Sequence, residues 1–564
     1  MNLKYFKDIL LDNNKIENIY GLENKKYLNT VYEIFISCDL VVNKNRIPIF
    51  IGINRDWCLK LFDFYIKDYD TFSFIPHVEK NGKLCLYDLE GTLIENNAEG
   101  VLNQCIDKAI EIINNGLSTS NKSEFIREFS TYWLNLDLCR ILELDTPKIR
   151  EVTQIKVRRK NNCKDNIDLF SFKNNEALIG GKDDSKFLLW YYKRGKSQLH
   201  NGLYVPLKMD LLYPPDFRKH LSSEYINNIL RHIDSCKLFS FIKKLSYKKL
   251  IIFDILVANT ENVIFGVIFK ENDLQIVENT YHLTKEAKVI PIFVKRTDAK
   301  SLMIRTSDLG NPIISKRFLL IGCGSIGGYV AQFMVQSGCT NIDLVDMDFM
   351  NYENIYRHIL GISYVDINKA RALKLYLDHN NPYLNLRDLN DNILNLVNKN
   401  IIKFSDYDMI ISVTGNQTLN LWLDNYLKEY NINIPVIYAW NEPLDIGCHA
   451  CFISNEYNSH YSDLFYRDME TRALYNRYSY CKNNQNITKN YSGCGGTFIP
   501  YGTEVSIQSA IMVLDLIKRW ISNRISTNLV VSVKGNGFFF EKAGFEVSEF
   551  YNNQENIKEE QELN

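Results

Sequence analysis

Hydrophobic and polar residues change their period along the chain, and this change divides it into regions. Residues 33–42 and 46–53 are rich in β-branched and apolar side chains and are separated by the turn-like Asn43-Lys44-Asn45, which predicts two strands of an antiparallel meander. Apolar positions then recur at helical spacing over residues 97–115 and 123–136. We therefore expect the chain to begin with an α+β region.

The middle of the chain, residues 151–295, mixes both periods. Strand-like runs cover residues 186–192, 250–257 and 262–269, and a helix is expected around residues 222–245. This region carries no motif of known chemistry. We expect a mixed α/β middle domain that acts as a spacer or a dimer platform.

From residue 296 onward, short apolar strands alternate with helical stretches. Predicted strands cover residues 317–321, 341–346, 409–414 and 435–440, and a helix ending at Ser337 follows the first of them. This alternation predicts a mostly parallel sheet covered by helices, as in Rossmann-like α/β folds. The expected domains are residues 1–150, 151–295 and 296–545, followed by a polar tail, residues 546–564, that frays.

Composition and charge place the chain among globular proteins. Of its 564 residues 46% are apolar and 24% are charged, which excludes a long disordered protein. Lys and Arg number 66 against 67 Asp and Glu, so no basic field attracts nucleic acid or an anionic membrane. The first 22 residues lack a signal-like apolar run, and glycines interrupt the most apolar window, residues 318–335. Thirteen scattered cysteines fit a reducing compartment, so we expect a cytoplasmic protein without a membrane span.

The clearest chemical motif is a glycine-rich turn between a strand and a helix. Gly322, Gly324 and Gly327 follow the apolar strand of residues 318–321. Glycines allow a tight turn and close approach of the backbone to phosphate, and the helix N-terminus offers unpaired N–H groups. Asp346 ends the next strand, where a carboxylate can accept hydrogen bonds from ribose hydroxyls. The motif predicts a nucleotide site.

Four polar residues beyond Asp346 narrow the choice of nucleotide chemistry. They are Asp348, Asn354, Arg357 and Lys369. A nicotinamide dinucleotide does not require them, whereas a triphosphate attacked at its α-phosphorus develops negative charge that Arg, Lys and amide donors stabilise. Asp348 can accept from the nucleotide or help to hold Mg²⁺. The set favours ATP over NAD.

These residues, in this order, resemble the ThiF-type adenylation fold of ubiquitin-activating enzymes and of bacterial enzymes that activate sulfur carriers. The resemblance implies that the glycine turn, Asp346, Asp348, Asn354, Arg357 and Lys369 bind ATP with Mg²⁺ and promote adenylation of a protein's C-terminal carboxylate. It also implies a homodimer through this domain, with an arginine supplied in trans for which Arg296 and Arg305 are both candidates. Two departures are His358, where relatives usually have Gln, and Gly415, where they have Asp. The second leaves the placement of magnesium open.

Two cysteines are candidate acyl carriers. Cys494 lies among small residues in the sequence Ser-Gly-Cys-Gly-Gly, where a bulky acyl group can approach the thiol. Its position after the adenylation motif resembles activating enzymes that form thioesters. The nearby Cys448-x-x-Cys451 is a single pair within an apolar strand, so we expect buried sulfur there and not a zinc site.

The second candidate, Cys85, follows His77 by eight residues across a glycine-containing loop. This spacing resembles the ubiquitin-conjugating fold, in which an Asn precedes the catalytic Cys by eight residues, with His77 in the place of that Asn. The resemblance implies that Cys85 carries the acyl group and that His77 stabilises the oxyanion as an amine attacks. An imidazole N–H can make such a donation.

Together the two resemblances match the fused ubiquitin-transferase-like enzymes of bacterial CBASS anti-phage operons. This family implies that the acyl donor is the C-terminal tail of a cGAS-like cyclic-oligonucleotide synthase and that the acceptor is an amine, such as a protein lysine. Tethering both activities would raise the effective concentration of one thiol near the other. Three alternatives remain open: a stand-alone carboxylate activator with a non-catalytic partner-binding domain, a non-enzymatic scaffold, and a nicotinamide oxidoreductase.

Overall fold

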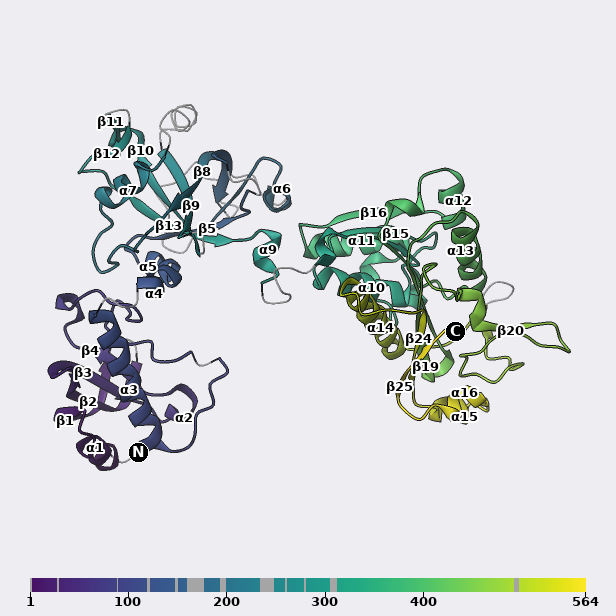
Figure 1. Ribbon diagram of the computed structural model, residues 1–564, viewed down its shortest axis with the longest axis horizontal. Helices are drawn as coiled ribbons and strands as arrows, with labels where there is room; N and C mark the ends of the chain where they lie inside the picture. Colours follow the sequence, from purple (N-terminus) through teal and green to yellow (C-terminus); the bar gives the residue numbers. More distant parts are fainter. Residues whose placement is uncertain are drawn as a thin grey trace. The chain divides into compact units, whose positions relative to one another are not determined.

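The computed structural model describes residues 3–27, 30–88, 90–118, 122–147, 151–159, 177–192, 199–233, 248–258, 261–277, 280–304, 312–490 and 497–563. The chain folds as two compact units, Met1–Asp298 and Ala299–Asn564. The first unit contains an antiparallel sheet and a closed barrel, and the second contains a large mixed sheet (Figure 1).

The first part of unit 1 is an antiparallel meander with one helix across it. Its strands pair in the order β1-β2-β3-β4, and the bounds are α1 Leu3–Leu11, β1 Ile16–Tyr27, β2 Thr30–Val42, β3 Asn45–Ile53, α2 Trp57–Lys60, β4 Asp63–Ile66, η1 Tyr69–Thr71 and α3 Ala98–Leu117. Asn43 and Lys44 both adopt positive φ, which suits a two-residue hairpin turn. Asn97 caps α3, and the helix buries its apolar face against the sheet. The predicted α+β region is confirmed.

The second part of unit 1 is a seven-stranded closed barrel of order β10-β13-β5-β7-β6-β8-β9. Its elements are α4 Lys122–Arg127, α5 Phe129–Leu134, β5 Arg140–Leu144, β6 Thr153–Arg159, β7 Ala177–Gly181, α6 Lys186–Tyr192, β8 His200–Met209, α7 Ser223–Leu230, β9 Lys248–Val257, β10 Glu261–Lys270, η2 Glu271–Asp273, β11 Leu274–Val277, β12 Thr280–Leu283 and β13 Ile290–Arg296. Because β5 is a barrel strand, the barrel includes residues on both sides of position 150.

Three sequence predictions for unit 1 need correction. Residues 186–192 form helix α6 and not a strand, because the Ser185 hydroxyl accepts a hydrogen bond from the Leu188 N–H and so starts a helical turn. The helix predicted over residues 123–136 is broken at Glu128 into α4 and α5. The helix predicted around residues 222–245 ends at Leu230, and residues 234–247 lie outside the described part of the chain.

Unit 2 is built on an eight-stranded sheet of order β16-β15-β14-β17-β18-β19-β24-β25, with five parallel strands followed by three antiparallel ones. Its strands are β14 Arg317–Ile321, β15 Asn341–Val345, β16 Asn385–Leu389, β17 Met409–Ser412, β18 Val436–Asn441, β19 Gly447–Ile453, β20 Phe465–Arg467, β21 Leu474–Asn476, β22 Lys489–Asn490, β23 Thr497–Phe498, β24 Leu529–Lys534 and β25 Lys558–Glu562. The helices are α9 Ala299–Leu302, η3 Pro312–Ser315, α10 Ser325–Gln336, η4 Tyr352–Asn354, η5 Ile362–Tyr364, α11 Lys369–Asn380, α12 Ile393–Asn398, η6 Phe404–Asp406, α13 Gln417–Glu429, η7 Pro443–Asp445, η8 Tyr461–Leu464, α14 Thr503–Ile521, α15 Phe538–Lys542 and α16 Glu549–Asn553.

Both faces of this sheet are covered, as expected for a Rossmann-like fold. Alternate residues of β14 enter different cores: Phe318 and Leu320 pack with α10, α11 and α14, whereas Leu319 and Ile321 pack with α12 and α13. The predicted strands and the glycine-turn helix are confirmed. The polar tail does not fray, because β25 pairs with β24 along residues 558–562 and extends the sheet. Within the described residues, no helix is both long and apolar enough to cross a membrane.

Candidate functional site

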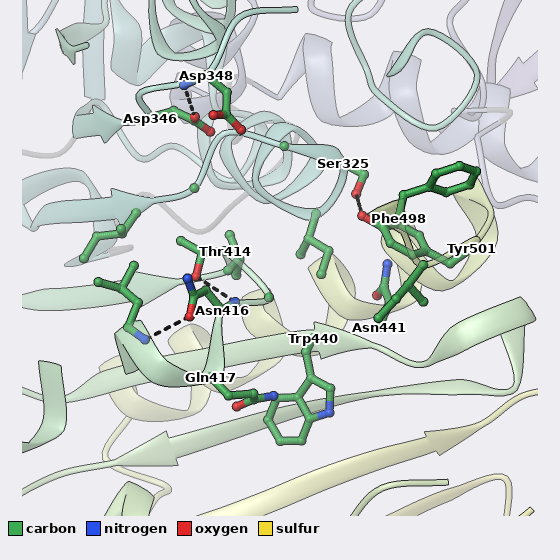
Figure 2. Close-up of a pocket in the computed structure, with 18 of the residues that line it drawn as sticks. Ser325, Asp346, Asp348, Thr414, Asn416, Gln417, Trp440, Asn441, Phe498 and Tyr501 are labelled. Atoms are coloured by element: carbon green, nitrogen blue, oxygen red, sulfur yellow. Dashed lines mark hydrogen bonds between the residues drawn. The ribbon is translucent and has the colours of Figure 1, made fainter. Parts of the chain in front are cut away.

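A cavity of about 1100 Å³ opens at the carboxyl ends of the parallel strands of unit 2 (Figure 2). This is where ligands bind in open α/β sheets. The predicted nucleotide residues that line it are Gly322, Gly324, Asp346, Asp348, Asn354, Arg357 and Lys369. Residues 322–369 therefore meet at one site, although the chain between them forms a helix, a strand and a long loop.

Gly327, unlike the other predicted nucleotide residues, does not line the cavity but packs behind its wall. A Cβ atom at this position would lie 1.9 Å from the Gly322 carbonyl oxygen, so only glycine lets α10 approach the turn. Gly322 adopts φ +94, which an L side chain rarely adopts. A Cβ atom at Gly324 would meet no other atom within 4 Å, and this residue lines the cavity. The turn thus provides open backbone, next to the N-terminus of α10, for a phosphate group.

Asp346 and Asp348 stand together on one side of the cavity (Figure 2). The Asp346 carboxylate accepts hydrogen bonds from the Cys323 N–H at 2.7 Å and the Asp348 N–H at 2.9 Å, which ties the aspartate loop to the glycine turn. Burial raises the pKa of Asp346. Asp348 is more exposed, and its carboxylate forms an ion pair with Lys369 at 3.1 Å.

Asn368 holds the aspartate loop and Lys369 in place, and sequence reasoning missed it. Its amide donates hydrogen bonds to the carbonyl oxygens of Asp346 and Asp348, at 2.9 and 3.1 Å. Its side-chain oxygen also caps α11, of which Lys369 is the first residue. An Asn directly before a helical stretch is a usable N-cap signal, so the sequence contained a clue.

Arg357 lines the cavity with its guanidinium 4.9 Å from the centre of the Tyr501 ring. The Tyr501 hydroxyl in turn hydrogen-bonds Ser325 at 2.9 Å, as Figure 2 shows. Asn354 also lines the cavity, and its side-chain oxygen accepts a hydrogen bond from the Asn351 N–H. Arg357 is therefore positioned by an aromatic face, and among the described residues it forms no ion pair, so its positive charge is available at the cavity.

His358, which departs from the usual Gln, has a structural role in the site. It is 6% exposed, its Nε2 donates to the Cys323 carbonyl oxygen at 2.7 Å, and its Nδ1 accepts from the Leu360 N–H. Burial lowers the pKa of His358 to about 4, so the imidazole stays neutral at pH 7. The glycine turn is therefore supported by a single N–H donor from His358. An amide side chain can provide such a donor as well.

The second departure, Gly415, also faces the cavity. It adopts φ +69, and the turn that contains it leads to Asn416, which caps α13. Within the described residues, no three His, Cys, Asp or Glu side chains are grouped to hold a metal ion. Mg²⁺ that is bound with a nucleotide usually has only one or two carboxylate ligands besides phosphate oxygens, so such a site does not require a group of three.

The two cysteines of the Cys-x-x-Cys pair do not meet. Cys448 packs in the core on one face of the sheet and Cys451 in the core on the other, because side chains three apart on a strand point to opposite faces. Both are fully buried, so the pair cannot hold one ion with both sulfurs. Cys494 and Arg305 lie outside the described residues. Arg296, the other candidate for a trans role, forms an ion pair with Asp298 at 3.0 Å.

Cys85 and His77 form the candidate site of unit 1. Cys85 is exposed, and its N–H donates to the His77 carbonyl oxygen at 2.8 Å, so the loop brings the two residues side by side. Partial desolvation, followed by the charges of Glu79 and Glu128, raises the pKa of Cys85 to about 11. A thiol with this pKa is a poor nucleophile at pH 7.

The His77 ring lies between two carboxylates that the sequence did not reveal. Its Nδ1 is 2.6 Å from Glu128 Oε1 and its Nε2 is 3.0 Å from Glu124 Oε2. The hydrogen bond to Glu128 is the main cause that raises the pKa of His77. Both ring nitrogens are therefore engaged, and one must leave its carboxylate before the ring can donate to an oxyanion.

Comparison with known proteins finds one family match in each unit. Residues 303–550 match the ThiF family, and residues 21–137 match prokaryotic E2 family B. An "ATP-dependent ubiquitin transferase-like protein Cap2" of Escherichia coli strain TW11681 is 24% identical over 486 residues, covering 77% of this chain and 78% of that protein.

A protein of the same name from Pseudomonas aeruginosa strain BWHPSA011 / Pa011 is 26% identical over 241 residues, covering 42% of this chain and 41% of the relative. Among solved structures, E. coli MccB with ATP aligns at 16% identity and a TM-score of 0.31 over 44% of this chain and 64% of that one. The family matches and the Cap2 relatives bear out the expected resemblance. The chain is a fused protein that joins an E2-like region to a ThiF-type region.

Proposed function

We propose that the chain uses ATP to adenylate the C-terminal carboxylate of a partner protein in the unit 2 cavity. A carboxylate oxygen attacks the α-phosphorus, a new acyl–oxygen–phosphorus linkage forms, and pyrophosphate leaves with the electron pair of the broken bond. The turn at Gly322 and Gly324, with Gly327 packed behind it, would bind phosphate, and Asp346 would accept from ribose hydroxyls. Arg357, Lys369 and the amide of Asn354 would stabilise the charge that develops on oxygen.

Mg²⁺ would be held by Asp348 together with phosphate oxygens, and it would neutralise charge on the triphosphate. The ion pair between Asp348 and Lys369 keeps both groups at the cavity wall. The turn with Gly415 supplies no carboxylate where related enzymes have one, so metal binding would depend on Asp348 and the nucleotide.

The acyl group would then pass through two thioesters. The thiol of Cys494 would attack the mixed anhydride and release AMP, and the thiol of Cys85 would take the acyl group by exchange. An amine, such as a protein lysine, would attack the Cys85 thioester, forming an amide and restoring the thiol. His77 would stabilise the oxyanion once one of its ring nitrogens leaves its carboxylate.

For the partner, we propose the C-terminal tail of a cGAS-like synthase in an anti-phage system. The name of the Cap2 relatives, "ATP-dependent ubiquitin transferase-like", supports a protein substrate. We also propose a homodimer through the ThiF-type region. Five large apolar side chains are exposed there between positions 347 and 362, namely Met347, Phe349, Tyr352, Tyr356 and Ile362. A short segment that exposes this many large apolar side chains supports an interface there.

One observation carries this proposal: the same chain contains both candidate sites. In unit 2 the glycine turn lines one cavity with Arg357 and Lys369, and in the E2-like region the thiol of Cys85 is exposed. A second candidate function is a stand-alone carboxylate activator with a non-catalytic N-terminal domain. The pKa of about 11 at Cys85 and the engaged ring of His77 favour it.

The variant Cys85→Ala distinguishes the two candidates. If the two-thioester reaction occurs, this variant keeps partner-stimulated exchange of labelled pyrophosphate into ATP and a reductant-labile adduct on unit 2, but it forms no amide conjugate. The buried Cys105→Ala serves as a cysteine control outside the site. Full conjugate formation by Cys85→Ala would contradict the proposal and support the stand-alone activator. Absence of any exchange by the wild-type chain with its partner would contradict both.

A further inference from the structure

The backbone of His77 adopts a conformation that must be held from outside. Its φ of +61 lies in the left-handed region, which is unfavourable for residues other than glycine unless the surroundings fix it. On one side its carbonyl oxygen accepts from the Cys85 N–H. On the other, its N–H is 3.0 Å from the Tyr132 hydroxyl and 3.2 Å from Glu128 Oε2. The loop is therefore fixed between the Cys85 segment and helix α5.

The helices that hold His77 belong to the core of the barrel and not to that of the meander. Phe129 and Trp133, on α5, are buried in the cluster formed by the barrel strands, and both rings contact Phe265 of β10, with centroids 5.1 and 4.1 Å apart. The Trp133 indole N–H also donates to the Ile292 carbonyl oxygen of β13 at 3.0 Å. The position of α5, and with it that of Glu128 and Tyr132, is thus set by barrel residues.

The barrel also holds the segment that leads into the His77 loop. The Arg218 side chain, 7% exposed and paired with Asp216, donates to the carbonyl oxygens of Tyr69 and Phe72. Next to it, Phe217 stacks on Tyr132 with centroids 5.4 Å apart. Two neighbouring residues, Phe217 and Arg218, therefore contact both the segment before the His77 loop and the Tyr132 side chain that holds this loop.

We infer that the barrel is a working part of the Cys85 site: through Phe265, Trp133 and Tyr132 it positions His77 beside Cys85. This inference rests on the proposed function and goes beyond it, because it assigns the middle region a role in amine transfer. Tyr132, Trp133 and Phe265 act as positioning residues, since none of them would contact the acyl group. Misplacement of a reacting group by about 1 Å can lower a rate by about two orders of magnitude.

The sharpest test compares two identical substitutions in the barrel core. Phe265→Leu removes the ring that contacts α5, whereas Phe253→Leu removes a neighbouring ring for which the structure gives no aromatic contact with α5. Both residues are fully buried, so we expect similar losses of stability. Each full-length variant is loaded with the partner's tail, and discharge of the Cys85 thioester to free lysine is timed in a single turnover. We expect Phe265→Leu to slow discharge about tenfold relative to Phe253→Leu, with loading of Cys85 much less affected.

A second pair of variants keeps the inference testable if either barrel variant fails to fold. Tyr132→Phe removes the hydroxyl beside the His77 N–H. Tyr225→Phe removes a hydroxyl from a partly buried residue of the same aromatic cluster, and this hydroxyl donates instead to the Tyr213 carbonyl oxygen. Discharge that is slower in Tyr132→Phe but unchanged in Tyr225→Phe supports the inference. Equal discharge rates within both pairs would overturn it.

A measurement without the partner separates failure of this inference from failure of the proposed function. If wild-type Cys85 is never loaded, the proposed function fails, yet amide hydrogen exchange of residues 74–86 still reports on the loop. We expect exchange at His77 and Cys85 to be faster in Phe265→Leu than in Phe253→Leu. Identical protection in the two variants would contradict the role of the barrel.

Discussion

The nucleotide cavity and the Cys85 loop are assembled in different ways. Gly322 to Lys369 lie within 48 consecutive residues, and one strand–turn–helix unit with its following loop brings them together. The Cys85 loop instead depends on side chains more than 40 positions from His77, including Glu124, Glu128 and Tyr132. The nucleotide-site residues can therefore be recognised together as one motif, whereas at the Cys85 site the sequence shows the His77–Cys85 spacing but not the distant side chains that hold it.

The largest expected effect tests the local construction of the nucleotide cavity. In Gly327→Ala the new methyl group would lie 1.9 Å from the Gly322 carbonyl oxygen, so α10 and the turn must separate. We expect a loss of several kcal/mol in the free energy of unfolding and no measurable pyrophosphate exchange. Thermal unfolding and the exchange assay measure both effects. Gly361→Ala, which meets no atom within 4 Å, is the control and should behave as wild type. A stable, active Gly327→Ala would contradict the packing argument.

The next effect separates charge from packing in the same cavity. Lys369→Met keeps most of the side-chain volume and removes the positive charge that pairs with Asp348. We expect pyrophosphate exchange to fall by about two to three orders of magnitude, because a preorganised cation stabilises developing charge in a cleft. Lys374→Met, on the same helix and paired with Asp388, is the matched control. Equal activity of the two variants would show that Lys369 does not serve the reaction.

A smaller effect is expected at the thiol of unit 1. With its pKa at about 11, Cys85 reacts with iodoacetamide slowly at pH 8 and faster as the pH rises. Because the charge of Glu79 contributes to this raised pKa, Glu79→Gln should increase the rate at pH 8 about two- to fivefold. Peptide mapping by mass spectrometry measures the rate at this one thiol. A rate that does not change would show that Glu79 does not influence Cys85, and the exposed Glu90→Gln provides the comparison.

The smallest effect concerns the pH dependence of stability in unit 1. The pKa of His77 is raised by Glu128 and Glu124, while the pKa of Glu128 is lowered by His77 and Tyr132 against the effect of burial. The contribution of His77 to the free energy of unfolding is thus complete below about pH 6.5, the pKa of His77 in the unfolded chain. It disappears as the pH rises through the higher pKa of His77 in the folded chain. The Glu128 contribution disappears as the pH falls below about 4.

We therefore expect the free energy of unfolding of His77→Asn to be about 1 kcal/mol lower than that of wild type at pH 6, and the difference to be smaller at pH 9. Chemical unfolding at the two pH values measures this difference. His220→Asn is the control, because His220 is largely exposed and lies 3.4 Å from Asp137 at the surface. A loss in His77→Asn that is the same at both pH values would contradict the ion-pair interpretation.

Much of the fold was predictable where one local signal dominated. The alternation in residues 317–346, the turn-like Asn43-Lys44-Asn45 and the helical spacing of residues 97–115 all specify their elements through neighbouring residues, and these elements formed as predicted. The prediction was wrong for residues 186–192, whose aromatic composition favours a strand. There the Ser185 cap decided for a helix.

The polar tail is a second case in which the local sequence pattern gave a wrong prediction. Residues 558–562 contain four charged side chains and no hydrophobic period, so the sequence predicts fraying. Backbone hydrogen bonds to β24, together with the Arg519–Glu560 ion pair at 2.7 Å, make the tail an edge strand. An edge strand does not require a buried face when a neighbouring strand supplies its hydrogen-bond partners.

The sequence by itself determined the glycine turn, the order of the nucleotide-binding candidates and the eight-residue spacing between His77 and Cys85. These are properties of short segments, in which backbone freedom and residue spacing act directly. Only the tertiary structure decided that Glu124, Glu128 and Tyr132 hold His77 and that the barrel supports the Cys85 loop. Contacts between distant segments depend on how whole elements pack, and no local pattern encodes that packing.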